Sequence, residues 1–315
     1  MRWVTYPSSE GQSRVGLIHG EAVHGLEPGV TMQKVLNQQD GFAAAYREAI
    51  GAPTEVVALD QVRLEAPLQP SSIRDCLGFL QHLRNCAEGA GLDVNDRYAQ
   101  VPAFYFSNHG AVIGPYDDVA ISPGSSRFDY ELEVCAVIGK SGSNISYDDA
   151  PLHIAGYTIL CDWSARDLQV LDMSMGLGPG KGKDGATTLG PMLVTPDELA
   201  LYQQGNGFAL TMTAYINGEE TGAGRWDQID WDFADMIVYL SRGTSLRPGD
   251  VIGSGTVPTG CLFEHFVMAP DTFRGWLSPG DEVRLVVEEL GEIRNRVVAG
   301  SPPQPLRRGH DRRQR

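Results

Sequence analysis

The arrangement of strand-like segments constrains the fold of this chain more than any other feature. From about residue 100 onward, short apolar runs alternate with turns rich in glycine and proline. Among these turns, Asn217-Gly218 is typical of a tight β-hairpin. Helical patterns are few and do not alternate regularly with the strands. The sequence therefore predicts an α+β protein, predominantly β, built as a mixed and largely antiparallel β-sandwich roll with added helices.

Three parts follow one another along the chain. Residues 1–68 contain a predicted hairpin, "VGLIHGEAVHGL", and two short helical patterns, which indicate a small N-terminal α+β domain. The proline-marked connector "EAPLQPSS" leads into the larger predicted domain, residues 69–300. Residues 301–315 begin "SPPQP", end "RRGHDRRQR" and contain almost no apolar residues. They are predicted to form a disordered basic tail.

Composition excludes several classes of protein. The net charge is −15, and since the last fifteen residues carry +4, residues 1–300 carry −19, which argues against nucleic acid as a partner. The five cysteines form no C-x-x-C pair, as in proteins of a reducing cytoplasm. No signal peptide is visible, and no run reaches the ~18 apolar residues of a membrane span. We therefore expect a cytoplasmic protein that binds neither nucleic acid nor membrane.

Two glutamates stand inside the strand-like segment "FDYELEVCAVIGK", residues 128–140. Side chains two positions apart lie on the same side of a strand, so Glu131 and Glu133 point together, whereas the opposite side is apolar. One interpretation is a strand with one wet face. The other is a metal site, because adjacent carboxylates repel each other unless a cation holds them.

A third carboxylate ends another apolar strand. Asp162 follows "GYTILC" and precedes a predicted helix at Ser164. Here an acidic side chain could simply stabilise the N-terminus of the helix through the helix dipole, or it could join the two glutamates. Three carboxylates without cysteine or histidine would suit Mg²⁺, Mn²⁺ or Ca²⁺ better than Zn²⁺.

These segments carry a resemblance to a known family. In order and spacing, "FDYELEVCAVIGK", "IAGYTILCDWSARDLQ", "GKDGATTLGPMLVT" and "LRPGDVIGSGT" resemble the fumarylacetoacetate hydrolase family over roughly residues 70–300. The resemblance implies a mixed β-sandwich roll with a smaller N-terminal domain, usually as a homodimer. It also implies that Glu131, Glu133 and Asp162 bind a divalent cation, with Mg²⁺ expected first and Ca²⁺ or Mn²⁺ as alternatives.

The stretch "SIRDCLGFLQHLRNCAEGAG" is predicted to be one helix, in which Ser72 and Asp75 could form a capping box. Two helical turns would bring Asp75 and His82 to the same face. The resemblance is to the hydrolases proper of the family, in which an Asp joins the metal site and a His is the general base. Asp75 and His82 match those positions. The alternatives are a helix cap for Asp75 and an exposed helix position for His82.

Further site residues follow from the same resemblance. "GSGTVPTGCLFEHF" matches Thr256 to a position that contacts substrate and Glu264 to the carboxylate that orients the general base; His265 is assigned to the surface. A His near pKa 6.5 can take a proton from water, and a carboxylate on its other nitrogen fixes its tautomer.

The glycine-rich stretch "GLGPGKGKDGATT" is not a dinucleotide site, since no strand precedes it and no clear helix follows. By resemblance, Lys183 rather than Lys181 is the active-site lysine, and Thr187 lies beside the metal. On the "SARDLQ" helix, Arg166 and Gln169 share a face. Gln169 matches a substrate-contacting position. Arg166 could contact substrate or form a structural salt bridge.

Two positions depart from the hydrolases proper. Met173 and Leu77 stand where those enzymes have tyrosines. A less polar pocket is therefore expected, which argues against fumarylacetoacetate as the substrate.

The leading prediction is a metal-dependent hydrolase that cleaves a C–C bond of a 1,3-dicarbonyl or acylpyruvate-type β-keto acid. His82, oriented by Glu264, would activate water, and the metal with Lys183 would stabilise the enolate leaving group. The first alternative is a decarboxylase or keto–enol isomerase of a small 2-oxo dicarboxylic acid on the same metal site. A further alternative, ranked lower, is a non-catalytic binding relative without metal.

Overall fold

The computed structural model describes residues 1–8, 11–38 and 40–306. In the larger sheet, eleven strands are joined, and strand β1 of the N-terminal part pairs with β14 near the middle. Its strands are, in spatial order, β4 (Glu55–Ala58), β3 (Ala22–Gly25), β2 (Ser13–His19), β1 (Arg2–Pro7), β14 (Thr187–Val194), β12 (Ile154–Asp162), β10 (Leu132–Ile138), β20 (Val251–Gly253), β5 (Ile73–Cys76) and β6 (Phe104–Ser107), with β7 (Val112–Ile113) beside β14.

A second, smaller sheet packs against the first. It consists of β18 (Glu219–Arg225), β17 (Thr211–Ile216), β21 (Glu282–Val287), β22 (Gly291–Val298) and β8 (Val119–Ala120). The described residues also contain three short pairs of strands: β9 (Phe128–Asp129) with β13 (Ser164–Ala165), β11 (Gly142–Ser143) with β19 (Ser245–Leu246), and β15 (Gln203–Gln204) with β16 (Gly207–Phe208). Buried side chains of both sheets share one hydrophobic core. The predicted predominantly β, α+β sandwich fold is confirmed.

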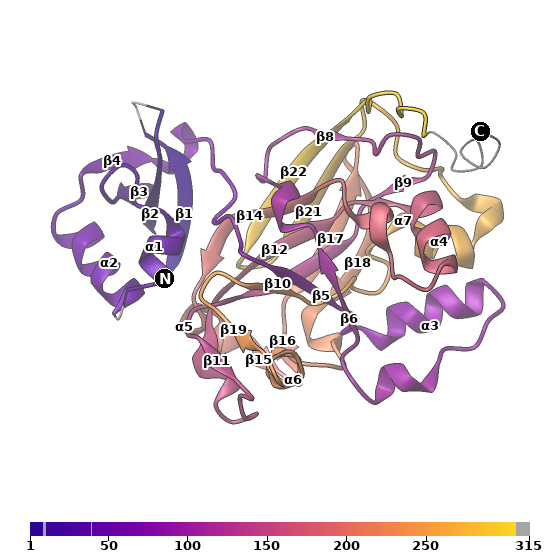
Figure 1. Cartoon of the computed structure of the whole chain (residues 1–315). Helices are drawn as coiled ribbons and strands as arrows, with labels where there is room; N and C mark the ends of the chain where they lie inside the picture. Colours follow the sequence, from indigo (N-terminus) through magenta and orange to yellow (C-terminus); the bar gives the residue numbers. More distant parts are fainter. Residues whose placement is uncertain (9–10, 39, 307–315) are drawn as a thin grey trace, which may run out of the picture.

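Seven α-helices lie around the sheets in the described part of the chain. They are α1 (Met32–Leu36), α2 (Gly41–Gly51), α3 (Leu80–Gly89), α4 (Arg166–Ser174), α5 (Pro196–Leu199), α6 (Phe233–Leu240) and α7 (Leu262–Met268). In Figure 1, α1, α2 and β1–β4 form the lobe on the left, and α3, α4 and α7 lie together at the right of the larger lobe. The boundary at residue 68 stays a prediction. Residues 301–306 of the predicted tail are exposed, and residues 307–315 lie outside the described part.

Strand β10 is buried on both faces, so the interpretation of a wet face is wrong. Leu132 and Val134 belong to the core between the two sheets. On the other face, Cys135 and Val137 pack in a second cluster that includes Trp3 of the N-terminal part. A central strand covered on both sides has no solvent-facing position, so its carboxylates need partners within the protein.

The prediction of one helix from Ser72 onward is also wrong. Residues Ile73–Cys76 form β5, in which Asp75 pairs with Gly253 on one side and Tyr105 on the other. Helix α3 begins only at Leu80, and its first amide donates to Asp230 Oδ2 at 2.8 Å rather than to a local cap. Residues 73–76 are a strand because they pair with β20 and β6, and the local sequence pattern does not show this pairing.

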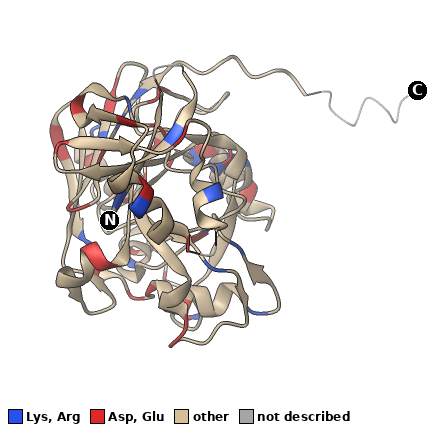
Figure 2. Ribbon diagram, turned by 90° about the vertical axis from the view of Figure 1, so that its left-hand side faces the viewer, with Lys and Arg blue, Asp and Glu red and all other residues tan. Residues whose placement is uncertain are grey.

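Other local predictions are confirmed. Asn217-Gly218 joins β17 and β18, and Gly20 lies in the turn between β2 and β3. Helix α6 begins after Asp232, whose side chain caps it. Figure 2 shows Lys and Arg interspersed with Asp and Glu over the ribbon. Across the described ranges, no helix has the length and apolar character to cross a membrane.

Candidate active site

The predicted carboxylates meet at one end of six neighbouring strands of the larger sheet. Register aligns Asp162 with Thr187 and aligns Gly253 with Asp75, which in turn faces Tyr105. Glu133 lies near the start of β10, between the β12 and β20 neighbours. The contributing strands are, in order, β14, β12, β10, β20, β5 and β6. The sheet thus brings together acidic residues that lie far apart in the sequence.

Lys183 lies inside this carboxylate cluster. It ends the short 3₁₀ helix η5 (Gly180–Lys183) and is buried, and its Nζ lies 2.8 Å from Asp162 Oδ2 and 2.7 Å from Ser164 Oγ. The same ammonium group also donates to Glu131. Lys181, in contrast, is exposed and pairs with Asp184. The structure therefore brings Lys183, not Lys181, to the cluster.

A tyrosine that the sequence did not single out also belongs to the cluster. The hydroxyl of Tyr105 lies 2.7 Å from Asp75 Oδ2 and also contacts Asp162 Oδ2. In "AFYFS" no pattern distinguishes this tyrosine from the adjacent phenylalanines, because its role depends on the pairing of β5 with β6. Asp75 is therefore part of the cluster, although it reaches it from a strand and not from a helix.

Glu133 is held by the loop that follows β20. Its carboxylate accepts from the backbone amide of Gly255 at 3.0 Å and from Thr256 Oγ1 at 3.4 Å. Gly253 allows β20 to lie close to the Asp75 side chain of β5, because a Cβ at this position would lie 2.3 Å from Asp75 Oδ1. Thr256, predicted to contact substrate, thus has Glu133 as its partner here.

Glu131 lies between two cations. Its Oε1 is 2.8 Å from Arg166 Nη1, and its Oε2 contacts Lys183. The Arg166 guanidinium also pairs with buried Asp129, at 2.7 Å, and donates to Gln169 Oε1 at 3.1 Å. In this arrangement Arg166 has the geometry of the structural salt bridge, with Gln169 as its neighbour.

The charges of the cluster are only partly compensated. Burial opposes ionisation of Glu131, but Lys183 and Arg166 lower its pKa to about 2. Burial and the neighbouring charge of Asp75 raise the pKa of Glu133 well above its usual range. Burial also raises the pKa of Asp162 to about 7, although Lys183 opposes this. With all of its carboxylates ionised, the cluster would hold more negative charge than Lys183 and Arg166 balance, so an additional cation would favour the ionised forms of Glu133 and Asp162.

These residues fit a hard divalent cation. Asp75 Oδ1 and Asp162 Oδ1 are buried and have no hydrogen-bond partner within the described ranges. The available donors are carboxylate and hydroxyl oxygens, the ligands that Mg²⁺, Mn²⁺ and Ca²⁺ prefer. Thr187 is buried at the start of β14, and its Oγ1 lies 3.5 Å from Ser107 Oγ. Lys183 stands between Glu131 and Asp162, so these two carboxylates are linked through the lysine in this structure.

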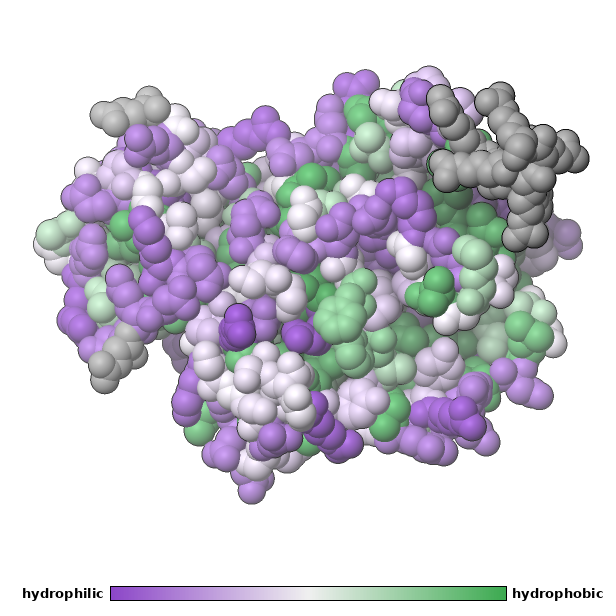
Figure 3. All heavy atoms as spheres, viewed as in Figure 1, coloured by the Kyte–Doolittle hydropathy of each residue, from purple (hydrophilic) through white to green (hydrophobic). Residues whose placement is uncertain are grey.

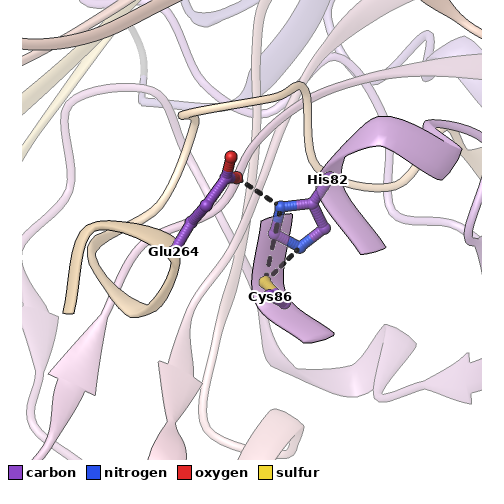
Figure 4. Close-up of side chains that lie close together, drawn as sticks. All are labelled: His82, Cys86 and Glu264. Atoms are coloured by element: carbon purple, nitrogen blue, oxygen red, sulfur yellow. Dashed lines mark hydrogen bonds and ion pairs between the residues drawn. The ribbon is translucent and has the colours of Figure 1, made fainter. Parts of the chain in front are cut away.

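His82 and Glu264 form a buried pair beside the cluster (Figure 4). His82 Nδ1 lies 2.6 Å from Glu264 Oε2, and Thr259 N donates to the same oxygen at 2.9 Å. A ring nitrogen of His82, a Glu131 oxygen and the Cys261 sulfur all lie within 4.8 Å of one another. The exposed-helix alternative for His82 is therefore wrong, and the structure brings the predicted pair together.

Burial opposes protonation of His82. The contacts of its ring with Cys86 and Glu264 nevertheless raise its pKa to about 10. His265, in contrast, is only half-buried, and its Nε2 lies 3.1 Å from Thr259 O. The predicted assignment of His82, rather than His265, to the site therefore agrees with the geometry.

A surface depression opens next to the cluster. It has a volume of about 470 Å³, and its lining includes Ser107, Asn108, Lys183 and Asp184. A larger cavity of about 770 Å³ lies elsewhere, between β1 and the connector before β5, and its lining contains none of the predicted site residues. Of the predicted site residues, Lys183 is the one that lines the smaller depression, so the depression reaches the carboxylate cluster at this lysine.

The chain has relatives of known sequence. Residues 71–298 match the family model described as "Fumarylacetoacetate (FAA) hydrolase C-terminal". The chain is 33% identical over 268 residues to the protein named "Oxaloacetate tautomerase FAHD2A, mitochondrial" of Homo sapiens, covering 85% of this chain and 80% of that protein.

Solved structures share the fold. Fumarylacetoacetate hydrolase from Exiguobacterium antarcticum is 24% identical with a TM-score of 0.72, covering 95% of this chain and 99% of that one. Maleylpyruvate hydrolase from Sphingobium sp. SYK-6, solved with manganese(II) and pyruvate, is 22% identical with a TM-score of 0.70, covering 96% of this chain and 100% of that one. With the match over residues 71–298, these findings identify the chain as a member of the fumarylacetoacetate hydrolase family.

Proposed function

We propose that this protein catalyses keto–enol interconversion of a small 2-oxo dicarboxylic acid, with oxaloacetate as the first substrate to test. The observation that carries the proposal is the buried carboxylate cluster with Lys183 inside it, 2.8 Å from Asp162. Keto–enol interconversion needs a group that moves a proton to or from the α-carbon and a cation or hydrogen-bond donor that stabilises the enolate oxygen, and it needs no activated water. The tautomerase name of the human relative supports this class of reaction and substrate.

In this proposal, Glu131, Glu133 and Asp162 hold a divalent cation, with Asp75 and Thr187 beside them. When bound, the cation supplies Lewis acidity at the 2-oxo group. We propose Mg²⁺ as the ion, because the donors are oxygens. Mn²⁺ and Ca²⁺ are the alternatives that metal analysis would distinguish.

The protein's own residues supply the donors. Lys183 carries a positive charge, since Asp162 and Glu131 raise its pKa although burial opposes this. Its three N–H donors face Glu131, Asp162 and Ser164, and exchange of one of these contacts would let Nζ donate a hydrogen bond to an enolate oxygen as negative charge develops there. Gln169 and Thr256 are the neighbouring polar groups available to the carboxylates of the substrate, and Arg166 holds Glu131 in position.

His82 suits proton delivery better than proton removal. A raised pKa of about 10 keeps its imidazole protonated near neutral pH. A protonated imidazole can give a proton to the carbon of an enolate but cannot accept one from water. This favours the isomerase interpretation over the hydrolase that the sequence put first.

The experiment follows the decay of enol-oxaloacetate by ultraviolet absorbance, with protein supplied with Mg²⁺. We expect decay faster than in buffer, abolished by a chelator and restored by metal. Pyruvate is measured in parallel, because its release would indicate decarboxylation instead. A decay rate equal to that of buffer, in protein shown by elemental analysis to hold metal, would rule the proposal out.

C–C bond hydrolysis is the second candidate, favoured by the 2.6 Å contact between His82 and Glu264. This geometry is that of a general base with an orienting carboxylate. An acylpyruvate assayed beside oxaloacetate separates the two, because only hydrolysis yields two carboxylic acid products. The non-catalytic alternative predicts that the purified protein contains no metal.

Assembly and location stay predictions. The proposed homodimer would be tested by light scattering of the full chain. The human relative's name places that protein in mitochondria, whereas the cytoplasm was expected for this one. Fractionation of the source cells would decide between them.

A further inference from the structure

Cys86 lies beside the His82–Glu264 pair but has no part in the proposed reaction. Of the five cysteines, all within the described residues, it is the one that is not fully buried. It follows His82 by one helical turn on α3, so both side chains share a face. Its sulfur lies 3.9 Å from His82 Nδ1 and 3.8 Å from Nε2.

Glu264 completes a set of three potential ligands from a second helix. Figure 4 shows its carboxylate and the Cys86 sulfur approaching the same imidazole from α7 and α3. One ligand atom from each of His82, Cys86 and Glu264 lies within 4.8 Å of the others. A thiol, an imidazole and a carboxylate are all ligands that Zn²⁺ takes in proteins.

We propose that His82, Cys86 and Glu264 form a second metal site, selective for Zn²⁺ and separate from the carboxylate cluster. Tetrahedral bonds of about 2.0 Å to nitrogen and 2.3 Å to sulfur imply an N···S separation of about 3.6 Å. Nδ1, the ring nitrogen that faces Glu264, lies 3.9 Å from the Cys86 sulfur, which is close to this value. The Nδ1–Oε2 distance of 2.6 Å would lengthen to about 3.4 Å as the ion enters.

Donor chemistry separates the two sites. The carboxylate cluster offers oxygen and suits Mg²⁺, whereas thiolate and imidazole favour Zn²⁺ over a hard cation. The Zn²⁺ ligands also have outer partners: Asn85 Nδ2 donates to Glu264 Oε1, and Thr259 N donates to Oε2 at 2.9 Å. Such partners hold a ligand in orientation and raise metal affinity.

A competing set shares the same histidine. His82, Glu131 and Cys261 also have ligand atoms within 4.8 Å of one another. Glu131, however, belongs to the proposed carboxylate site, and both of its oxygens already contact a cation, Arg166 or Lys183, so it is not free for a second metal ion. Cys261 is fully buried, so an ion would reach it less easily than Cys86. The Cys86 set is therefore the better site.

Zinc at this site would remove His82 and Glu264 from the reaction. The protein would then be inhibited by Zn²⁺ while Mg²⁺ stays bound at the carboxylates. This inhibition rests on the proposed role of His82 in catalysis. The binding itself does not, so a failure of the proposed function would leave the zinc site testable.

The test titrates Zn²⁺, and Co²⁺ as its spectroscopic substitute, into the full chain held in excess Mg²⁺. We expect one tightly bound Zn²⁺ and a thiolate-to-cobalt charge-transfer band. Cys86→Ser should abolish the band and weaken Zn²⁺ binding at least about tenfold, the lower limit for losing even an outer partner. Cys261→Ser is the matched control and should keep both the charge-transfer band and the Zn²⁺ affinity. Glu133→Gln should keep the band but lose Mg²⁺ binding.

The wild-type protein provides a second measurement that does not depend on a variant folding. Zn²⁺ should slow the alkylation of Cys86 by iodoacetamide, measured by mass spectrometry. Loss of the band in Cys261→Ser with its retention in Cys86→Ser would overturn the assignment in favour of the other set. A Cys86 thiol that reacts equally fast with and without Zn²⁺ would overturn the site itself.

Discussion

The hydroxyl of Tyr105 lies 2.7 Å from Oδ2 of Asp75 and also contacts Oδ2 of Asp162. A phenol has one proton, so it can satisfy only one of these buried carboxylates at a time. Burial and both carboxylates raise the pKa of Tyr105 well above its usual value, which keeps this proton in place. Tyr105 therefore links β6 to the ends of β5 and β12 across the site.

Tyr105→Phe should destabilise the metal-free protein. The change removes the hydroxyl that donates to buried Asp75, whereas Asp162 keeps Lys183 as its partner, and loss of such a buried donor costs about 1–3 kcal/mol in the free energy of unfolding. Urea denaturation in the presence of a chelator would measure it. Tyr46→Phe, at an exposed position, is the control and should change little. Equal stability of the two variants would contradict this role of Tyr105.

Glu133→Gln should separate metal binding from folding. Glu133 is nearly inaccessible, and burial together with Asp75 raises its pKa, so the neutral amide relieves repulsion in the metal-free protein. We expect unimpaired stability without metal but Mg²⁺ affinity reduced more than about 100-fold, since loss of an outer partner alone costs about 10–100-fold. Calorimetric titration would test this, with Glu220→Gln on the surface as the control. Unchanged affinity would remove Glu133 from the metal site.

Lys183→Met tests the charge balance of the cluster. Removing the ammonium leaves Glu131 with Arg166 alone and Asp162 without its cation. Breaking one side of a buried ion pair costs about 3–5 kcal/mol. Lys181→Met, at a lysine with 63% side-chain exposure, should stay within about 0.5 kcal/mol of wild type. Thermal unfolding of both variants without metal would measure the difference, and similar losses would disprove the central position of Lys183.

His82→Gln separates the two candidate reactions. If His82 delivers a proton to an enolate, the variant should lose about 100-fold or more in the ketonisation rate, within the usual range for acid–base catalysis. Metal content should stay the same, because the carboxylate ligands are untouched. His265→Gln is the matched control, since that half-buried histidine lies outside the pair and its Nε2 is 3.1 Å from the backbone oxygen of Thr259. A variant with full ketonisation but no acylpyruvate cleavage would instead support hydrolysis.

The sequence predicted what depends on local pattern. The hairpin at Asn217-Gly218 and the strand around Glu133 carry their signals in neighbouring residues, and both are present. The carboxylates, Lys183 and the His82–Glu264 pair were assigned from family resemblance, and the structure brings them together. Spacing alone could not have placed Asp162 beside Glu131, because their proximity depends on the pairing of β10 with β12.

What the sequence missed depends on contacts between distant segments. Asp75 was expected on a helix, but parallel pairing with β20 makes its segment a strand. Tyr105 and Asp129 had no local signal. Asp129 accepts from the first amides of α7, at Leu262 and Phe263, and pairs with Arg166. These residues gain their roles only when the sheet and its helices have packed.

Asp167 provides the pH-dependent prediction, at the start of α4 and away from the metal ligands. It accepts from Ser125 Oγ and Ser126 N, both at 2.7 Å. Burial opposes its ionisation, yet these hydrogen bonds hold its pKa below the usual value. Because its pKa is lower in the folded state, the ionised carboxylate stabilises the fold at pH values above the unfolded-state pKa of about 3.9. This stabilisation is lost as the pH falls through the folded-state pKa.

Asp167→Asn should therefore be less stable than wild type near neutral pH, by about 1 kcal/mol for a partly exposed group. The difference should shrink as pH falls below about 4, where the wild-type carboxylate also becomes neutral. Urea unfolding at pH 7 and at progressively lower pH would measure it. Glu220→Gln, at an exposed acidic position, is the control. A stability difference that grows on acidification would show that the carboxylate charge does not stabilise this loop.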